Sequence, residues 1–196
     1  MSPISKLVFL ILPVILAGVS NMIFMKRPIL QSWRIPMDGG KVLADGERLF
    51  GDNKTWKGFV GMIIFMAFWM WMFEIWAKHS PAISELSLIP YTTFHFPFNG
   101  LFYGAIWGLG YVLAELPNSY LKRRMKIQPG KSAEGKYKLF FTILDQSDSV
   151  IGCLIFMRVF YAPSLIDSFM ILIIASGFHY LTNVGLYFVG LKRQRG

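Results

Sequence analysis

Five long apolar runs, separated by polar or proline-containing segments, dominate the pattern of hydrophobic and polar positions along the chain. The runs cover residues 7–25, 58–77, 101–116, 139–160 and 168–191. A helix needs about 20 predominantly apolar residues to cross the hydrocarbon core of a bilayer, and these runs approach that length. The pattern predicts an all-α, polytopic transmembrane bundle of about five spans, which forms a single domain over residues 1–196.

The first run also invites comparison with a secretory signal peptide, because Lys6 precedes it. The run is long for the apolar part of a signal peptide, and no clear small-residue cleavage site follows it. We therefore interpret residues 7–25 as a retained membrane anchor that is interrupted by Pro13.

Composition agrees with a membrane protein. The chain is 54% hydrophobic and only 16% charged, whereas about 25% of the residues in soluble domains are charged. The single cysteine, Cys153, excludes an intramolecular disulfide and any multi-cysteine metal site. Because it lies in an apolar run, we expect it to have a packing role.

The distribution of the 20 Lys and Arg residues predicts an orientation. Seven lie in residues 26–57, seven in residues 117–138 and three in the tail after residue 191. The other three are Lys6, Lys78 and Arg158. The positive-inside rule therefore predicts a cell-membrane protein whose N-terminus is outside and whose C-terminus is cytoplasmic. Its two functional loops are expected on the cytoplasmic side. We expect no nucleic-acid partner, and an oligomer stays possible.

Carboxylates lie near the facing ends of the third and fourth runs. Glu115 ends the third run, while Asp145 and Asp148 lie three residues apart at the beginning of the fourth, where one helix face aims both at a common point. Charges at the edge of a hydrocarbon layer are costly unless they pair or bind something. Carboxylate oxygens are ligands of Mg²⁺, so these three residues are the predicted metal site.

Cations lie between these acids. If the helix of Glu115 continues, Ser119 and Lys122 share its face, although Pro117 is expected to break the helix there. The cations follow in close succession: Lys122, Arg123, Arg124 and Lys126. The alternative is that they only satisfy topology and hold anionic headgroups. Since headgroups would repel the nearby acids, we favour a site for a metal and a phosphate-bearing substrate.

Residues 38–58 combine glycines, donors and cations in the way a phosphate-binding loop does. The segment is not a Walker A loop, and an ordinary pair of turns is the alternative. Because it is expected at the same membrane face as the acids, we predict that it binds nucleotide. The predicted contacts are Asp38, Gly39, Lys41, Asp52, Lys54 and Thr55.

Two polar residues, His179 and Asn183, lie one helical turn apart in the last run. Either they contact substrate or they form a hydrogen bond between helices, and both interpretations stay open. Glu74, His79 and His95 are expected on the opposite side, and no chemistry is assigned to them.

Together these motifs resemble the CDP-archaeol synthases, integral-membrane cytidylyltransferases related to CDP-diacylglycerol synthases. The resemblance rests on residues 36–41, 51–58, 122–124, 129–130, 144–148 and 179–183, and on Gly190-Leu-Lys192. One departure is that Glu115 stands where the family has aspartate, and Glu115-Leu-Pro-Asn replaces the usual Gly-Asp-Leu.

The resemblance implies Mg²⁺-dependent transfer of CMP from CTP to a membrane lipid phosphate, giving pyrophosphate and a CDP-lipid for phospholipid synthesis. The catalytic residues it implies are Lys122, Arg123, Asp145 and Asp148, with Ser119 and Asn183 joining the loop in substrate binding. The alternatives are a CTP-dependent lipid or polyprenol kinase and a non-catalytic membrane relative. A transporter is disfavoured because the chain shows no internal repeat.

Overall fold

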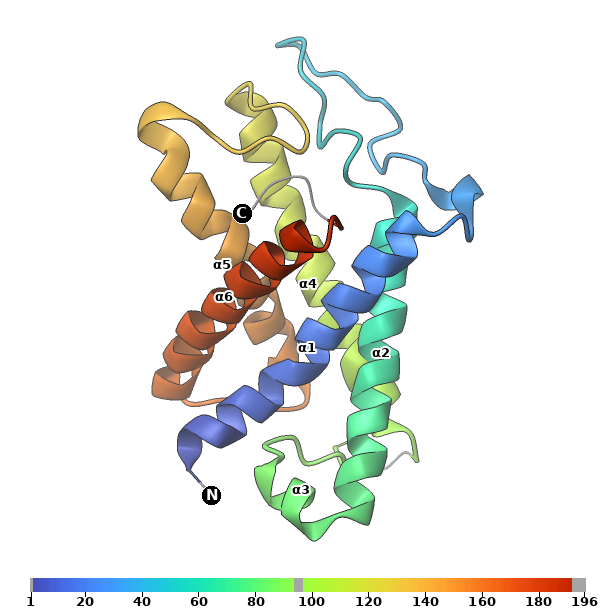
Figure 1. Ribbon diagram of the computed structural model, residues 1–196, viewed down its shortest axis with the longest axis vertical. Helices are drawn as coiled ribbons and strands as arrows, with labels where there is room; N and C mark the ends of the chain where they lie inside the picture. Colours follow the sequence, from blue (N-terminus) through green and yellow to red (C-terminus); the bar gives the residue numbers. More distant parts are fainter. Residues whose placement is uncertain (1, 94–96, 192–196) are drawn as a thin grey trace.

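The computed structural model describes residues 2–93 and 97–191, and five long helices account for most of this range. They are α1 (Pro3–Lys26), α2 (Trp56–His79), α4 (Asn99–Arg124), α5 (Lys138–Phe156) and α6 (Leu165–Phe188) (Figure 1). Shorter helices lie in the connections: η1 (Gln31–Trp33), α3 (Pro81–Leu86), η2 (Gly135–Tyr137) and η3 (Met157–Val159). The predicted all-α bundle is confirmed.

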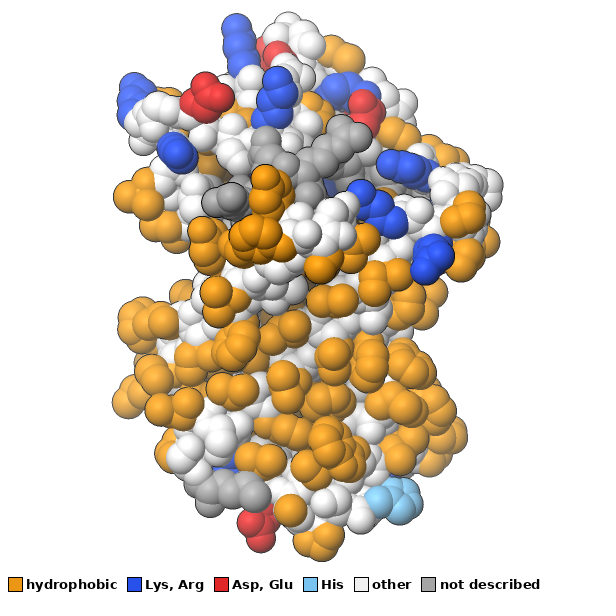
Figure 2. Space-filling view, in the orientation of Figure 1, with side chains coloured by type: hydrophobic (Ala, Val, Ile, Leu, Met, Phe, Trp, Pro, Cys, Tyr) orange, Lys and Arg blue, Asp and Glu red, His pale blue; other side chains and the backbone are white. Residues whose placement is uncertain are grey.

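Within the described residues, four helical segments are long and apolar enough to cross a membrane. They comprise α1, α2, residues 135–159 around α5, and α6, with mean hydropathies of 2.5, 1.8, 1.5 and 1.6. Figure 2 shows a broad belt of hydrophobic side chains over these helices and a charged end above it. The chain is therefore a multi-pass membrane protein. The fifth long helix, α4, is not among these four segments and carries more polar residues than its neighbours.

Helix α4 packs closely against α2 on one side and α5 on the other, because glycines line both contacts. A Cβ atom added to Gly104 would lie 2.4 Å from the backbone oxygen of Met66 in α2. One added to Gly152 in α5 would lie 2.1 Å from the backbone oxygen of Gly110. Small residues permit this approach.

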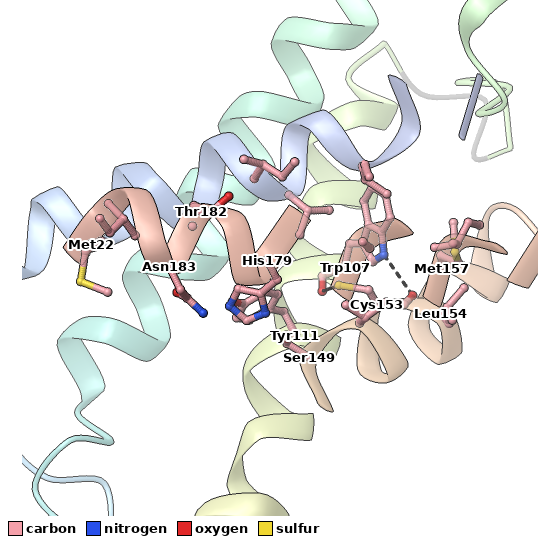
Figure 3. A pocket seen from close by; sticks show the side chains of 18 residues that line it. Met22, Trp107, Tyr111, Ser149, Cys153, Leu154, Met157, His179, Thr182 and Asn183 are labelled. Atoms are coloured by element: carbon pink, nitrogen blue, oxygen red, sulfur yellow. Dashed lines mark hydrogen bonds between the residues drawn. The ribbon is translucent and has the colours of Figure 1, made fainter. Parts of the chain in front are cut away.

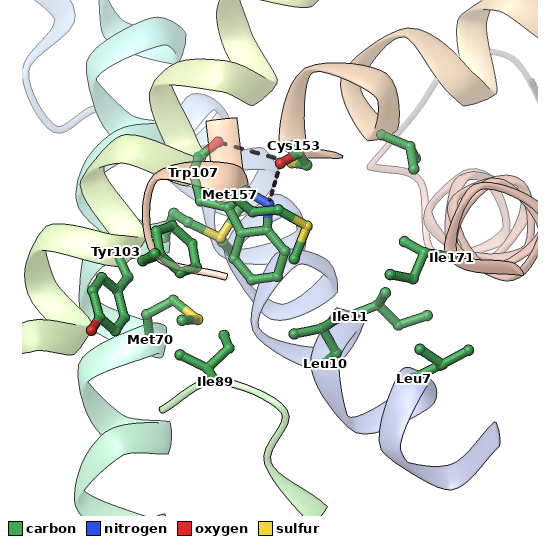
Figure 4. Packing of buried hydrophobic residues seen from close by; sticks show 14 of the residues in the cluster. Leu7, Leu10, Ile11, Met70, Ile89, Tyr103, Trp107, Cys153, Met157 and Ile171 are labelled. Atoms are coloured by element: carbon green, nitrogen blue, oxygen red, sulfur yellow. Dashed lines mark hydrogen bonds between the residues drawn. The ribbon is translucent and has the colours of Figure 1, made fainter. Parts of the chain in front are cut away.

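The core is built around the middle of α4 (Figure 4). Trp107 is fully buried, and its indole Nε1 donates a hydrogen bond of 3.0 Å to the backbone oxygen of Cys153 in α5. Tyr103 stacks on Phe160, with ring centroids 4.4 Å apart. Cys153 is buried here, in agreement with its expected packing role.

One boundary differs from the prediction, since Pro117 does not end the helix. Helix α4 continues through it to Arg124, so the connection to α5 is shorter than predicted. A proline inside a helix costs about 3 kcal/mol. The turns that follow Pro117 carry the hydrogen bonds of Asn118 to α5 and of Arg124 to the α1–α2 loop, and these tertiary contacts outweigh the cost.

The connections from α1 to α2 and from α4 to α5 lie at one end of the bundle, around the beginning of α5 (Figure 1). The connection that contains α3 lies at the other end, as does the N-terminus. We call residues 27–55 the α1–α2 loop and residues 125–137 the α4–α5 loop. His95 and the tail cations Lys192, Arg193 and Arg195 lie outside the described residues.

Candidate active site

The α1–α2 loop folds back on itself as an irregular ribbon. Antiparallel bridges join Pro36 to Thr55 and Val42 to Arg48. The backbone amide of Met37 donates to the oxygen of Lys54 at 2.8 Å. The loop is therefore an ordered part of the fold.

Asp38 organises this loop from within. Its side chain is fully covered, and it accepts hydrogen bonds from the Arg48 guanidinium at 2.5 and 3.3 Å. Backbone amides of Gly40, Phe50 and Gly51 also donate to it, at 3.1, 3.0 and 2.9 Å. Burial alone would raise the pKa of the Asp38 carboxyl, but these bonds outweigh it and hold the pKa well below its usual range.

Arg124, in the last turn of α4, fastens the α1–α2 loop to the bundle. Its guanidinium pairs with Asp45 and donates to the backbone oxygens of Arg48 and Glu47 at 2.6 and 3.3 Å. One cation of the basic cluster therefore has a structural task, which the sequence did not distinguish from a task in binding.

The α4–α5 loop packs against the same α1–α2 loop. A Cβ atom on Gly51 would lie 2.7 Å from the ring of Pro129, and one on Gly130 would lie 2.9 Å from the amide of Asn53. Both glycines have φ in the left-handed region, at 98° and 75°. Other residues are disfavoured there on both conformational and steric grounds.

These two loops and the ends of α4 and α5 enclose a polar cavity of about 850 Å³. Many of the residues predicted from the sequence line it: Lys54, Glu115, Ser119, Lys122, Arg123, Asp145 and Asp148. The structure thus brings together acids from two helices and cations from two separate segments.

Two carboxylates of α5 meet one amide of α4 in this cavity. Nδ2 of Asn118 donates to Oδ1 of Asp145 at 2.8 Å and to Oδ2 of Asp148 at 2.7 Å. Lys122 reaches the other oxygen of Asp145 at 2.5 Å. Oδ1 of Asn118 is buried without a hydrogen-bond partner among the described residues, an arrangement that costs about 1–3 kcal/mol.

Glu115 is held differently from the two aspartates. Its carboxylate pairs with Lys54 of the α1–α2 loop at 2.5 Å. Among the described residues, no three acidic, histidine or cysteine side chains lie close enough together to hold a metal ion. The predicted metal ligands Glu115, Asp145 and Asp148 therefore line one cavity without forming a three-acid group. The Glu115 carboxylate is instead paired with Lys54.

Arg123 is the most deeply buried cation of the cavity, with only 3% of its surface exposed. Its Nε and Nη1 have no hydrogen-bond partner in the described part of the chain. A buried charge is costly unless it is paired, so this guanidinium is suited to an anionic ligand.

Other predicted contacts of the α1–α2 loop do not line the polar cavity. Asp38 is enclosed in the loop, and Gly39 and Lys41 lie beside it. Thr55 caps α2 by accepting from the backbone amide of Gly58 at 3.2 Å. Asp52 pairs with Arg48 of the same loop at 2.8 Å. For all these residues the geometry indicates a role in shaping the loop.

A second cavity, of about 330 Å³, adjoins the polar one. It lies among α1, α2, α4 and the α1–α2 loop, and Asp52 and Thr55 line it. Arg34, Asn53 and Glu115 line both cavities, so the two spaces are neighbours at these residues.

His179 and Asn183 form contacts between helices, which was one of the two interpretations left open. Nδ2 of Asn183 donates to Oε1 of Gln146 in α5 at 3.0 Å, and Nδ1 of His179 lies 3.3 Å from the backbone oxygen of Gln146. Gln146 lines the polar cavity, whereas Asn183 lines a separate apolar one. Their hydrogen bond therefore forms part of the wall between the two spaces.

The apolar cavity, of about 100 Å³, lies among α1, α4, α5 and α6 (Figure 3). Ile11 and Val14 of α1 and Ile171 of α6 contribute to its hydrocarbon lining. Ser149 also lines it and directly follows Asp148 of the polar cavity. An apolar space thus ends close to the acidic groups.

Sequence analysis missed several residues of the polar cavity: Arg34, Asn53, Asn118, Lys131 and Gln146. Asn118 precedes Ser119, and Gln146 follows Asp145. Their position beside predicted site residues, near the ends of apolar helices, was the sequence feature that could have identified them. For Arg34 and Lys131 the sequence showed only a positive charge, and the positive-inside rule already accounted for that charge.

Comparison with known proteins gives one consistent family. The family model described as CarS-like, CDP-archaeol synthase, matches residues 2–194. The CDP-archaeol synthase of Thermofilum pendens is 30% identical over 184 residues, which cover 93% of this chain and 76% of that protein. That of Pyrococcus furiosus is 28% identical over 187 residues, with 95% of each chain covered.

A solved structure also shares the fold. It is described as an intramembrane enzyme for archaeal membrane lipids biosynthesis, and it superposes with a TM-score of 0.57. The match covers 90% of this chain and 92% of the other. At 22% sequence identity, this likeness bears on the fold alone.

Proposed function

Because this chain belongs to the CarS-like family of CDP-archaeol synthases, we propose that it transfers CMP from CTP to a lipid phosphate, forming a CDP-lipid and pyrophosphate. One observation carries the proposal: in the polar cavity, Nε and Nη1 of the buried Arg123 guanidinium have no partner among the described residues, and two aspartates share one neutral amide. Asp145 is paired with Lys122, but Asp148 forms no ion pair within the described residues. A buried guanidinium with unused donors and an aspartate without a cation suit a nucleotide that binds together with a metal ion.

The residues of the cavity fit Mg²⁺. Asp145 and Asp148 provide carboxylate oxygens, which this ion prefers, and the buried Oδ1 of Asn118 is without a donor in the described structure. When bound, the ion would screen the charge that builds up between two phosphates and would polarise the α-phosphate of CTP.

Lys122 takes part through a change of partner, and Lys54 from its place beside Glu115. Lys54 and Lys122 now neutralise Glu115 and Asp145, each at 2.5 Å. With the charge of the aspartates balanced by Mg²⁺, the Lys122 ammonium would be available to phosphate oxygens. Arg123 would offer the same oxygens a planar pair of donors. Lys54 lies in the opposite wall of the cavity, where it would contact the triphosphate.

The nucleoside has space beside the triphosphate. The cavity of about 330 Å³ opens from the same walls, at Arg34, Asn53 and Glu115. These residues offer donors and acceptors for the base and the ribose. The α1–α2 loop would thus bind the nucleotide mainly through Lys54 and its neighbours, on a frame that Asp38 maintains.

A lipid phosphate is already an anionic nucleophile and needs little help from a general base. The main barrier is the approach of two anions, which the cations of the cavity lower. The apolar cavity beside Ser149 would take hydrocarbon close to the reacting phosphate. The site is therefore expected at a membrane interface, and the excess of cations at this end supports a cytoplasmic location.

Product analysis tests the proposal. The full chain, in vesicles, is incubated with Mg²⁺, a panel of lipid phosphates and CTP labelled at the α-phosphate. We expect labelled lipid and one pyrophosphate for each lipid formed, because the bond between the α- and β-phosphates breaks.

The two alternatives give different results. Release of labelled CDP with an unlabelled lipid product would indicate a kinase. Absence of any CTP binding in the presence of Mg²⁺ would identify a non-catalytic relative. Either result would overturn the proposed function.

A further inference from the structure

Asn118 occupies a position that the sequence did not single out. It is 7% exposed and faces α5 from the turn of α4 that follows Pro117. Its single Nδ2 lies within 2.8 Å of one oxygen from each of Asp145 and Asp148. Two carboxylates are therefore held around one atom, as they would be around a small cation.

This amide is only half used. Its two hydrogens go to the two aspartates, while Oδ1 is buried and accepts nothing within the described part of the chain. An amide of this kind has two alternative orientations, related by a half-turn about the Cβ–Cγ bond. In the second orientation, Oδ1 would face the carboxylates, which is unfavourable unless a cation lies between them.

We propose that Asn118 is the third protein ligand of the divalent cation and changes from hydrogen-bond donor to metal ligand when the cation binds. The inference rests on the proposed function, because that function supplies the metal. Without the cation, Nδ2 moderates the repulsion between Asp145 and Asp148. With the cation, the amide turns and presents Oδ1, a type of oxygen that hard cations accept.

The alternative third ligand is Glu115, which the sequence favoured. Glu115 is occupied by Lys54 at 2.5 Å, and this pair joins the α1–α2 loop to α4. Asn118 already touches both aspartates, whereas among the described residues Glu115 does not lie close enough to them to form a group of three acids. The geometry therefore assigns Glu115 to docking of the loop and Asn118 to the metal.

Binding of Mn²⁺ to the purified full chain, followed by electron paramagnetic resonance with Mg²⁺ as competitor, tests the assignment without reference to turnover. Asn118→Leu keeps a similar volume but offers no oxygen, and we expect its affinity for Mn²⁺ to fall at least about tenfold. Asn118→Asp offers an oxygen with a charge. We expect it to bind Mn²⁺ at least as tightly as the parent chain and to unfold at a lower temperature when no metal is present.

Asn21 in α1 provides a matched control. Its Nδ2 donates to the backbone oxygen of Gly58 at 3.0 Å, and its Oδ1 is likewise buried without a partner in the described structure. It contacts no carboxylate in the described structure. Asn21→Leu is therefore expected to lower the thermal stability while Mn²⁺ affinity stays unchanged.

Parent-like Mn²⁺ affinity in Asn118→Leu would overturn the inference, and so would Asn118→Asp binding Mn²⁺ more weakly than the parent chain. The second variant decides the matter if the first does not fold. In either case the product analysis of the parent chain is unaffected, so the inference can fail while the proposed function stands. A parent chain that binds neither ion would overturn both the inference and the metal-dependent mechanism.

Discussion

Two neighbouring arginines show how differently single residues act at this site. Arg124 pairs with Asp45 and two backbone oxygens, and so holds the α1–α2 loop in place. Arg123 is buried, and two of its nitrogens have no partner among the described residues. In sequence the two are indistinguishable, since both belong to one basic run.

This contrast predicts opposite effects of the same substitution. Arg123→Gln removes a buried, uncompensated charge, so the stability of the ligand-free protein should be unchanged or higher, whereas CTP affinity should fall about tenfold or more. Arg124→Gln should instead lower the melting temperature, because loop contacts are lost. Thermal unfolding and calorimetric titration with CTP measure both quantities.

A clear drop in the stability of Arg123→Gln, with CTP affinity unchanged, would contradict the assignment of this residue to phosphate binding. Arg124→Gln serves as the control in the same assays, since it removes the same charge from the adjacent position.

Some residue roles were readable from sequence and others were not. The spacing of Asp145 and Asp148 on one helix face predicted that they act together, and both lie against Asn118. The pairing of Lys54 with Glu115 joins positions 61 residues apart and depends on how the loop folds. The capture of Asp38 within its own loop likewise depends on backbone amides, which leave no trace in a residue pattern.

At the scale of helices, close packing depends on small residues where α4 crosses its neighbours. Gly152 in α5 lies directly against Gly110 and Ala114 of α4, and a Cβ there would come within 2.1 Å of a backbone oxygen. Gly177 in α6 has nothing within 4 Å of the corresponding position. The two glycines lie in similar apolar helices but in very different surroundings.

We predict that Gly152→Ala lowers the free energy of unfolding by about 1–3 kcal/mol or more, because α4 and α5 must move apart. Gly177→Ala should be neutral or raise stability by up to about 1 kcal/mol, since alanine favours the helix. Thermal unfolding of both variants in the same detergent checks this. Equal melting temperatures for the two would show that α4 and α5 do not pack as described.

Helix positions were predictable because apolar runs mark them, and each of the five predicted runs overlaps one long helix. The continuation of α4 through Pro117 was not predictable by local rules. It depends on Asn118 and Arg124, whose hydrogen bonds to α5 and to the α1–α2 loop compensate the missing hydrogen bond. Local propensity and tertiary packing disagree here, and packing prevails.

The whole molecule divides into a charged end and an apolar body (Figure 2). The polar cavity lies among the loops of the charged end, and the apolar cavity lies in the body beside α1 and α6. Helix α6 buries few of its residues, namely Ile171, Asn183 and Leu186. This arrangement would let a lipid substrate bind its polar head in the polar cavity while its hydrocarbon chains stay beside the apolar body.

The central claim is that acids of α5 and cations of α4 and the α1–α2 loop form one site for a metal ion and CTP. Calorimetric titration of the full chain with CTP, with and without Mg²⁺, tests it most directly when the parent chain and Asp148→Asn are compared. We predict binding that requires Mg²⁺ in the parent chain, and a loss of about tenfold or more in the variant, which still folds. Equal CTP affinity with and without Mg²⁺, or parent-like binding of CTP and Mg²⁺ by Asp148→Asn, would contradict the account.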